Sequence, residues 1–496
     1  MAVTAAARPA TGIVPERARA SWTRFGLGGC LLLAFALRAP FLGTGLGKDE
    51  GGVAFIARTW PSGHGSLYGS YWLDRPPLLV GLYKLAVLGG DVGVRLLGAV
   101  AALALVAGIA QIARVVAGQR AGLIAGLLAA LLSGSAAIAS VYTPGELLAA
   151  VPSTLSVLCL VLAHRRRRTG LVFAAGLLAI AAVLIKQSFL DAGLAGVVFV
   201  IASGLADREV RVRWALAYVA GVAIPVAALL LWQVAARLPD GGFVYALVGF
   251  RIDGLHTLSA SNIPLHVRLK SLEAPAIGSG LVLVAGLALL GLPRLRGDRV
   301  LLATIAAWLV GATVGVLGGG SYWPHYLIEL VPVCCVAAAA GIAGSRPVTR
   351  VVAVGACVAV SLVAAVGGVT YLASHPPHTK AMAVGRYVRS HARPGDTQYV
   401  MYAQANVGYY TGLPSPYPYA WSLMVRAKPG AIPQLQRLLG SARRPTWLVQ
   451  FQAPGHWGLD PAGRTRRLIA RGYRLAATVR GHRIYLRSDR RLGSAR

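Results

Sequence analysis

Residues 147–185 read LLAAVPSTLSVLCLVLAHRRRRTGLVFAAGLLAIAAVLI, two apolar runs on either side of the basic cluster His164-Arg165-Arg166-Arg167-Arg168. An apolar run of roughly 17 to 25 residues is long enough to cross the hydrocarbon core of a bilayer. A basic connection between two such runs is typical of a cytoplasmic turn between transmembrane helices. A nucleic-acid site is another interpretation of an Arg cluster, but the position between two spans favours a topology signal.

The same apolar character extends over most of the chain. Hydrophobic residues make up 56% of its 496 residues and charged residues only 13%, whereas about a quarter of an ordinary soluble protein is charged. This composition excludes a soluble globular protein and predicts an α-helical polytopic membrane protein. We expect about eleven transmembrane helices, and at most about thirteen, from runs of spanning length. The runs begin near Phe25, Gly93, Ala121, Leu147, Leu171, Phe189, Trp214, Ala276, Val300, Tyr326 and Val351.

The formal net charge of +32 is unevenly distributed among the connections between these runs. Alternate connections are rich in Arg and are therefore predicted to be cytoplasmic. They comprise residues 114–120, 164–168, 207–213, 294–299 and 346–350. The connections between them carry nearly all the acidic residues of the membrane part, so we expect them on the outer face. An odd number of spans that starts inside also places the C-terminal tail outside.

This topology predicts three parts of the chain. Residues 1–24 form a cytoplasmic N-terminal tail, residues 25–373 a transmembrane domain with a first outer loop at 43–77, and residues 374–496 an extracytoplasmic C-terminal domain. In the C-terminal part, composition and periodicity predict strands at 397–402 and 446–451 and helices at 381–391 and 433–439. We therefore expect a small α/β domain there.

The first outer loop, residues 43–77, is longer than a connection between two spans requires, and long loops are usually functional. An apolar repeat of helical spacing from Val53 to Trp60 predicts an amphipathic interfacial helix that starts beside Asp49 and Glu50. Carboxylates at the start of a helix are favoured by its dipole. The pair could therefore be a helix cap, and alone it does not indicate a catalytic site.

Several further motifs follow this pair in order and share its predicted side of the membrane. They are Leu73–Leu79 (LDRPPLL), Arg95–Ala99 (RLLGA), Leu184–Gln187 (LIKQ), Tyr322–Tyr326 (YWPHY) and the tail segment Gly385–Gly412. Together with the acidic pair, they resemble the GT-C superfamily of integral membrane glycosyltransferases over nearly the whole chain. The greatest similarity is to the branch containing lipid A aminoarabinose transferases and protein O-mannosyltransferases. Arg75 and Gln187 depart from the aminoarabinose transferases, which leaves the donor sugar open.

The resemblance implies that a sugar moves from a polyprenyl-phosphate carrier to an acceptor on the outer face. Asp49 is then the general base that removes the proton of the acceptor, and Glu50 positions Asp49 or binds substrate. Fixed cations stabilise the charge that develops on the leaving phosphate. The candidates are Arg75, Lys186 and His325, the last beside Tyr326. Their alternative explanations are a loop anchor, a snorkelling lysine and an ordinary aromatic belt.

Two further residues are candidate substrate contacts. Glu146 follows Pro144 at the start of a predicted span, where the helix dipole already favours a carboxylate. Similar loops of the family carry an acidic group that faces the site. Lys48 is the second candidate; for it, as for the further possible contacts Arg58 and His64, a solvated surface position is the simpler explanation.

The resemblance also implies the partners: a polyprenyl-phosphate sugar donor, a lipid, glycan or protein acceptor, membrane lipids and no nucleic acid. Composition suggests a bacterium with a GC-rich genome, in whose cytoplasmic membrane mannose or arabinose would be natural donor sugars. No carboxylate or histidine cluster has the spacing of a metal site, although some GT-C relatives use a divalent cation.

The main alternative is a transporter or flippase of polyprenyl-linked substrates, because intramembrane ionisable groups also mark transport paths. The predicted clustering of these groups in outer loops favours sugar transfer.

Overall fold

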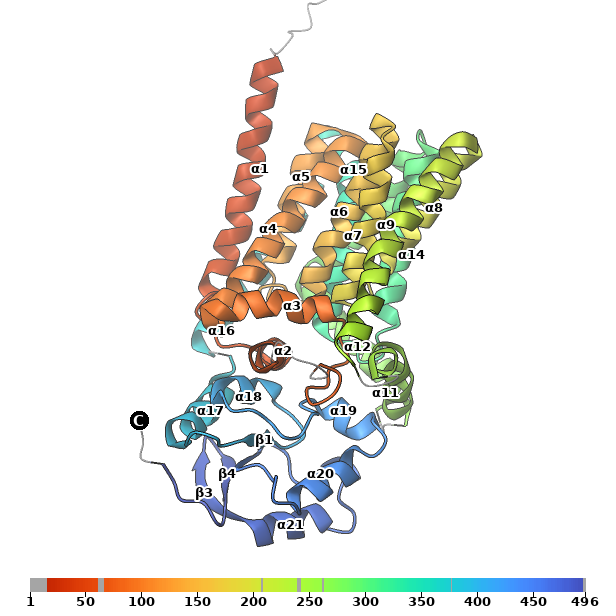
Figure 1. Ribbon diagram of the computed structural model, residues 1–496. Helices are drawn as coiled ribbons and strands as arrows, with labels where there is room; N and C mark the ends of the chain where they lie inside the picture. Colours follow the sequence, from red (N-terminus) through yellow and green to blue (C-terminus); the bar gives the residue numbers. More distant parts are fainter. Residues whose placement is uncertain are drawn as a thin grey trace, which may run out of the picture.

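The structure is a computed structural model that describes residues 16–60, 67–206, 208–238, 242–260, 263–375 and 377–493. A bundle of long helices makes up most of the molecule, and a smaller lobe with a β-sheet covers one end of it (Figure 1). The bundle helices are α1 (Glu16–Arg38), α4 (Gly90–Ala117), α5 (Gln119–Ser133), α6 (Gly145–Arg166), α7 (Thr169–Ile185), α8 (Asp191–Ala206), α9 (Arg208–Ala235), α12 (Leu265–Gly278), α13 (Leu281–Gly291), α14 (Arg299–Leu317), α15 (Val331–Ala343) and α16 (Pro347–Ser374). This is the predicted polytopic helical architecture.

The apolar helices correspond in position to the predicted runs, but in the described ranges fewer than the expected eleven reach the length of a full span. Within the described ranges, six helical segments are long and apolar enough to cross a membrane, or seven if the pair α12 and α13, bent by 84°, forms one span. Four more apolar helices are shorter, with 10–17 residues each. Each apolar run predicted from the sequence lies in one of these helices. The chain is therefore built as an integral membrane protein.

Short elements connect the bundle helices, and several of them lie at the end beside the lobe. They are α2 (Lys48–Thr59), α3 (Pro77–Ala86), α10 (Gly242–Val244), α11 (Phe250–Ser259), the π-helical turn Tyr245–Gly249 and the 3-10 turns Ala39–Phe41, Val87–Gly89, Leu292–Leu295 and Pro324–Leu330. Helices α2 and α3 lie across this end of the bundle, between the long helices and the lobe (Figure 1). Here the first predicted outer loop meets the C-terminal part.

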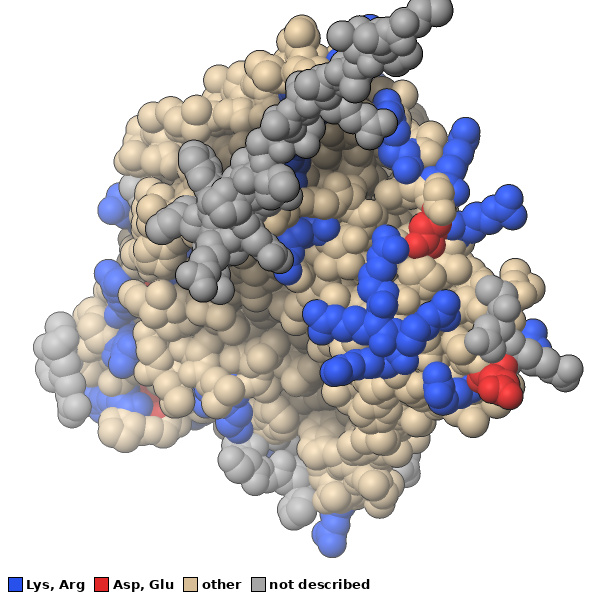
Figure 2. Space-filling view, turned by 90° about the horizontal axis from the view of Figure 1, so that it is seen from above, with Lys and Arg blue, Asp and Glu red and all other residues tan. Residues whose placement is uncertain are grey.

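The opposite end of the bundle is strongly basic. Figure 2 looks onto that end, where Lys and Arg side chains far outnumber Asp and Glu. Arg165 to Arg168 are all exposed there, and Asp298 joins two of the basic turns through His164, at 3.0 Å, and Arg165, at 3.6 Å. By the positive-inside rule we predict that this end faces the cytoplasm and that the lobe lies outside.

The lobe contains a four-stranded sheet in the order β1-β2-β4-β3. Strand β1 (Gln398–Val400) pairs parallel with β2 (Trp447–Gln450), and the hairpin of β3 (Tyr473–Val479) and β4 (His482–Arg487) extends the sheet antiparallel. Both residues of its turn have positive φ, 51° at Arg480 and 82° at Gly481, as a type I′ turn requires. Helices of the lobe are α17 (Thr379–His391), α18 (Ala405–Thr411), α19 (Ser422–Ala427), α20 (Ala431–Leu439) and α21 (Arg464–Gly472), with a 3-10 turn at His456–Gly458.

Helix α2 differs from the amphipathic interfacial helix expected from the sequence. Residues 50–57 are all buried, because the lobe covers the side of the helix that a membrane-surface helix would expose. Two glycines allow this close approach: a Cβ atom at Gly51 would lie 2.3 Å from Cβ of Asn406, and one at Gly52 would lie 2.3 Å from Cζ2 of Trp421. The first outer loop is thus clamped between the bundle and the lobe.

Candidate active site

A small, highly charged pocket lies where α2 meets the ends of the bundle helices. Its lining residues are Asp49, Glu50, Val53, Arg75, Leu79, Tyr83, Pro144, Gly145, Glu146, Lys186 and His325. These come from α2, α3 and its preceding loop, the start of α6, the end of α7 and the 3-10 turn before α15. Six of the predicted site residues therefore line one pocket, although they are far apart in the sequence. Lys48 and Tyr326 are the two that do not line it.

Glu50 is an anchor rather than a free carboxylate. It is only 5% exposed; its Oε1 accepts hydrogen bonds from the Arg95 guanidinium and from the Thr143 backbone N–H at 2.5 Å, while Oε2 accepts from the Gly47 N–H at 2.8 Å. Arg95, on α4, also donates to the Gly45 carbonyl at 2.6 Å. The carboxylate therefore fixes the start of α2 to α4 and to the segment before α6.

Asp49, the neighbouring residue, has a very different environment. Its side chain is exposed at the first turn of α2, where the helix dipole favours a negative charge. Its Oδ1 accepts a hydrogen bond of 3.0 Å from Nε1 of Trp421, a residue of the lobe. Adjacent residues of a helix point in different directions, so one carboxylate faces the protein interior and the other the open side of the pocket.

Arg75 belongs to a charge cluster in which one buried carboxylate meets two partly exposed guanidinium groups. Its Nη1 lies 2.5 Å from Oδ2 of Asp74, and Nη2 of Arg251, on α11, lies 3.2 Å from the same oxygen. Burial alone would raise the pKa of the Asp74 carboxyl, but Arg75 and Arg251 together lower that pKa below its ordinary value. Gln187 also donates to the Asp74 carbonyl at 2.8 Å. The two guanidinium groups share one carboxylate, so the cluster keeps a net positive charge.

A second cluster contains Glu146, Lys186 and His325. The Lys186 ammonium donates to Oε1 of Glu146, and His325 Nε2 lies 3.6 Å from the same oxygen. Lys186 is 5% exposed and Glu146 2% exposed. The Lys186 ammonium also lies 4.9 Å from the ring centroid of Tyr326, which places Tyr326 behind the pocket. Both groups of this ion pair are buried, so removal of either one would leave the other as an unpaired buried charge.

The remaining predicted contacts lie elsewhere. Lys48 is the exposed first residue of α2, and it is not among the residues that line the pocket. Arg58 donates to the Tyr409 carbonyl at 3.2 Å and lies 4.1 Å from its ring centroid, so it attaches α2 to the lobe. His64 lies outside the described residues.

Two side chains important to the pocket, Arg251 and Trp421, were missed from the sequence. Arg251 is about 65 to 180 residues from the other cations along the chain, in a segment with no recognised motif, and Trp421 lies 372 residues from Asp49. Arg95 was noted as part of a motif, and the structure adds its partner, Glu50. A buried charge requires a partner, and that rule could have signalled Arg95 in its apolar run.

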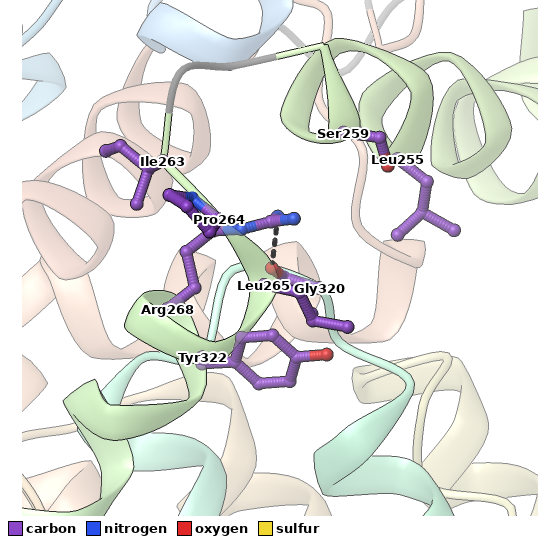
Figure 3. A pocket seen from close by; sticks show the side chains of 8 residues that line it. All are labelled: Leu255, Ser259, Ile263, Pro264, Leu265, Arg268, Gly320 and Tyr322. Atoms are coloured by element: carbon purple, nitrogen blue, oxygen red, sulfur yellow. Dashed lines mark hydrogen bonds between the residues drawn. The ribbon is translucent and has the colours of Figure 1, made fainter.

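A second pocket is lined by residues of α11, of the start of α12 and of the segment that precedes His325 (Figure 3). Leu255, Ile263, Pro264 and Leu265 give it apolar walls, and Arg268 donates a hydrogen bond of 3.0 Å to the Gly320 carbonyl. None of the predicted site residues lines it. The charged pocket is therefore the candidate active site. Among the described residues, no group of three or more His, Cys, Asp or Glu side chains could hold a metal ion, and we assign no step to one.

The fold matches solved structures of membrane proteins. The chain aligns with ArnT from Cupriavidus metallidurans bound to undecaprenyl phosphate at a TM-score of 0.66 and 15% identity, covering 94% of this chain and 98% of that one. It aligns with the oligosaccharyltransferase AglB from Archaeoglobus fulgidus, in complex with an inhibitory peptide and a dolichol-phosphate, at a TM-score of 0.55 and 14% identity, covering 95% and 75%. The protein is an integral membrane protein with the GT-C fold, as predicted.

A family model gives a second, independent match. Residues 75–232 match the family of dolichyl-phosphate-mannose-protein mannosyltransferases. This segment starts at Arg75 and includes Glu146 and Lys186, while Asp49 and His325 lie outside it. The resemblance to the GT-C superfamily is thereby confirmed. No curated protein sequence matches the chain.

Proposed function

We propose that this protein is a glycosyltransferase that moves a sugar from a polyprenyl-phosphate-linked donor to a lipid, glycan or protein acceptor. The reaction would take place on the outer face of a bacterial cytoplasmic membrane. The observation that carries the proposal is the gathering of Asp49, Arg75, Lys186 and His325 from distant segments around one pocket. Two structures of the same fold bind undecaprenyl phosphate and dolichol-phosphate, which supports a polyprenyl phosphate as the ligand of this pocket.

In the proposed reaction, a hydroxyl or amine of the acceptor attacks the anomeric carbon of the donor sugar. The bond between this carbon and the phosphate oxygen breaks, and its electron pair stays on the released polyprenyl phosphate. The Asp49 carboxylate takes the proton of the attacking group, and such general-base assistance typically contributes about 10² to 10⁴ in rate. Glu50, which is held by Arg95, keeps α2 in the position that this step requires.

The cations would bind the phosphate and stabilise the charge that it gains. The pocket has about 30 Å³ of free space, roughly what one water molecule occupies, so the side chains must separate to admit the donor. We expect the phosphate to replace part of the contact between Lys186 and Glu146. Arg75 can turn to the phosphate because Arg251 still neutralises Asp74.

A polyprenyl-linked substrate transporter is the alternative function. A transport path would require ionisable groups along the middle of the bundle. The charged pocket instead lies beside α2 and α3, at the end of the bundle that the lobe covers (Figure 1). This position favours a reaction at the membrane surface over transport.

Deletion of the gene followed by mass spectrometry of envelope lipids, glycans and proteins tests the proposal. We expect one sugar to be missing from one class of molecule, which identifies donor sugar and acceptor together. Wild-type protein should restore it, and Asp49→Asn should not, although it reaches the membrane in equal amount. An unchanged set of envelope sugars, with polyprenyl-linked sugars accumulating on the inner face, would instead support transport.

A further inference from the structure

One side chain of the lobe donates a hydrogen bond to the proposed base. Trp421 precedes α19, and its Nε1 donates a hydrogen bond of 3.0 Å to Oδ1 of Asp49. This is the single hydrogen bond that the Asp49 carboxylate makes to another side chain in the described part of the chain. The adjacent Glu50 carboxylate, by comparison, accepts three hydrogen bonds.

The Trp421 ring is held firmly enough to position a partner. Its edge packs on Gly52, where even a methyl group would lie 2.3 Å from Cζ2 and 2.9 Å from Cη2. Its backbone carbonyl accepts a hydrogen bond of 3.3 Å from the Val425 N–H at the start of α19. On the same interface, the Asn406 side chain of α18 donates to the Leu46 carbonyl at 2.9 Å. The indole therefore approaches Asp49 from a fixed direction.

An exposed aspartate at the start of a helix can adopt several rotamers, and only some of them direct a carboxylate oxygen toward the pocket. A donor on Oδ1 selects one rotamer and leaves Oδ2 to accept a proton. Catalytic bases are commonly oriented by a third group in this way.

We propose that Trp421 is the positioning residue of Asp49, so that the C-terminal lobe completes the active site of the membrane domain. The inference rests on the proposed role of Asp49 as general base. It assigns the lobe a part in the reaction: turnover requires the lobe to be docked on α2. Trp421 acts through Asp49 and does not contact the donor phosphate.

Trp421→Phe tests this role because it keeps an aromatic ring on Gly52 and removes the Nε1–H donor. With the donor and acceptor found by mass spectrometry, we expect kcat to fall about ten- to hundredfold, since hydrogen bonds to charged groups contribute about 1.5 to 3 kcal/mol. The KM for the donor should stay unchanged. Trp457→Phe, an exposed tryptophan of the same lobe, is the matched control and should behave as wild type.

Two further variants keep the test decisive. Benzothienylalanine at position 421 retains the bicyclic shape without the N–H, so it should reproduce the kinetics of Trp421→Phe even if the smaller ring of phenylalanine disturbs the lobe. In Asp49→Asn, adding Trp421→Phe should cause no further loss, because residues that act through one another are not additive.

The outcomes separate this inference from the proposed function. Wild-type kcat in both Trp421 variants, with Asp49→Asn inactive, would overturn the role of Trp421 alone. A fully active Asp49→Asn would overturn the proposed base and this inference with it. A fall in donor affinity as large as the fall in kcat would show that Trp421 holds the structure of the pocket rather than the base.

Discussion

The two sides of the charged pocket are built differently. On the cationic side, Lys186 and Arg75 are each paired with a carboxylate, and all these groups are provided by ends of the bundle helices and the loop before α3. On the other side, Asp49 is exposed, and within the described residues its carboxylate accepts one hydrogen bond from a side chain, which belongs to the lobe. The cationic side is thus complete within the membrane part, whereas the Asp49 side needs both parts of the molecule.

This difference matches the two substrates of the proposed reaction. A lipid phosphate is one constant group, and cations that already lie together at the pocket can bind it after local side-chain movements. An acceptor has to reach the base from outside, so the base cannot be enclosed by ion pairs. Substitutions on the two sides should therefore have separable effects, on donor affinity for one side and on turnover for the other.

Breaking the buried ion pair between Arg95 and Glu50, which fixes the start of α2, should give the largest effect. Arg95→Met leaves the buried Glu50 carboxylate without its cation, and breaking a buried ion pair costs about 3 to 5 kcal/mol. We expect a strongly reduced Tm of the detergent-solubilised protein and loss of transfer. Arg114→Met, at an exposed site of the same helix, is the control. Equal Tm values for the two variants would contradict the anchoring role of Glu50.

Lys186→Met tests the cationic side. It removes a hydrogen bond to a charged group, so affinity for undecaprenyl phosphate should fall about ten- to hundredfold. Binding can be measured by titration of the lipid into protein in nanodiscs. Lys270→Met, at an exposed position of α12, should bind as wild type. Unchanged affinity in Lys186→Met would mean that Lys186 only neutralises Glu146.

Gly52→Ala tests the docking of the lobe on α2. The added methyl group would lie 2.3 Å from Trp421 Cζ2 and 2.7 Å from Ala405 Cβ, and overpacking of this kind costs about 1 to 3 kcal/mol. Because α2 and the lobe must separate, turnover should fall severalfold while affinity for undecaprenyl phosphate is kept. Gly81→Ala, where no atom lies within 4 Å of the added group, should leave both quantities unchanged.

Asp74→Asn should give the smallest effect, and one that depends on pH. The lowered pKa of Asp74 means that folding favours its ionised form. The resulting stabilisation is present above the ordinary carboxyl pKa and is lost as the pH falls through the lowered value. Wild type should therefore have a higher Tm than Asp74→Asn at neutral pH, and the difference should shrink in acid. A difference that is constant with pH would show that the charge of Asp74 is unimportant.

Much of the fold could be predicted from the sequence, because spanning runs and Arg-rich turns are local patterns. The runs near Ala121 and Leu171 could be predicted although their helices are short, because each run begins directly after an Arg-rich connection. Strands β3 (YRLAATV) and β4 (HRIYLR) were missed because neither short sequence has a clear apolar alternation. The burial of α2 was also missed, since it depends on a lobe that follows hundreds of residues later.

The site was partly predictable for the same reason. Asp49, Arg75, Lys186 and His325 lie in short motifs whose order resembles a family, and the structure brings them to one pocket. No local pattern reveals that Trp421 donates to Asp49, or that Arg251 shares Asp74 with Arg75. Such pairs arise from packing between distant segments, which a single sequence does not encode in any short window.

The most direct test compares Asp49→Asn with Lys186→Met for two quantities, affinity for undecaprenyl phosphate and turnover of the identified donor. The separation of roles predicts that Asp49→Asn binds the lipid as tightly as wild type while its turnover falls about 10² to 10⁴ fold. Lys186→Met should instead lose affinity. Near-normal turnover in Asp49→Asn, or an equal loss of lipid affinity in both variants, would contradict the division of the pocket into a base side and a phosphate side.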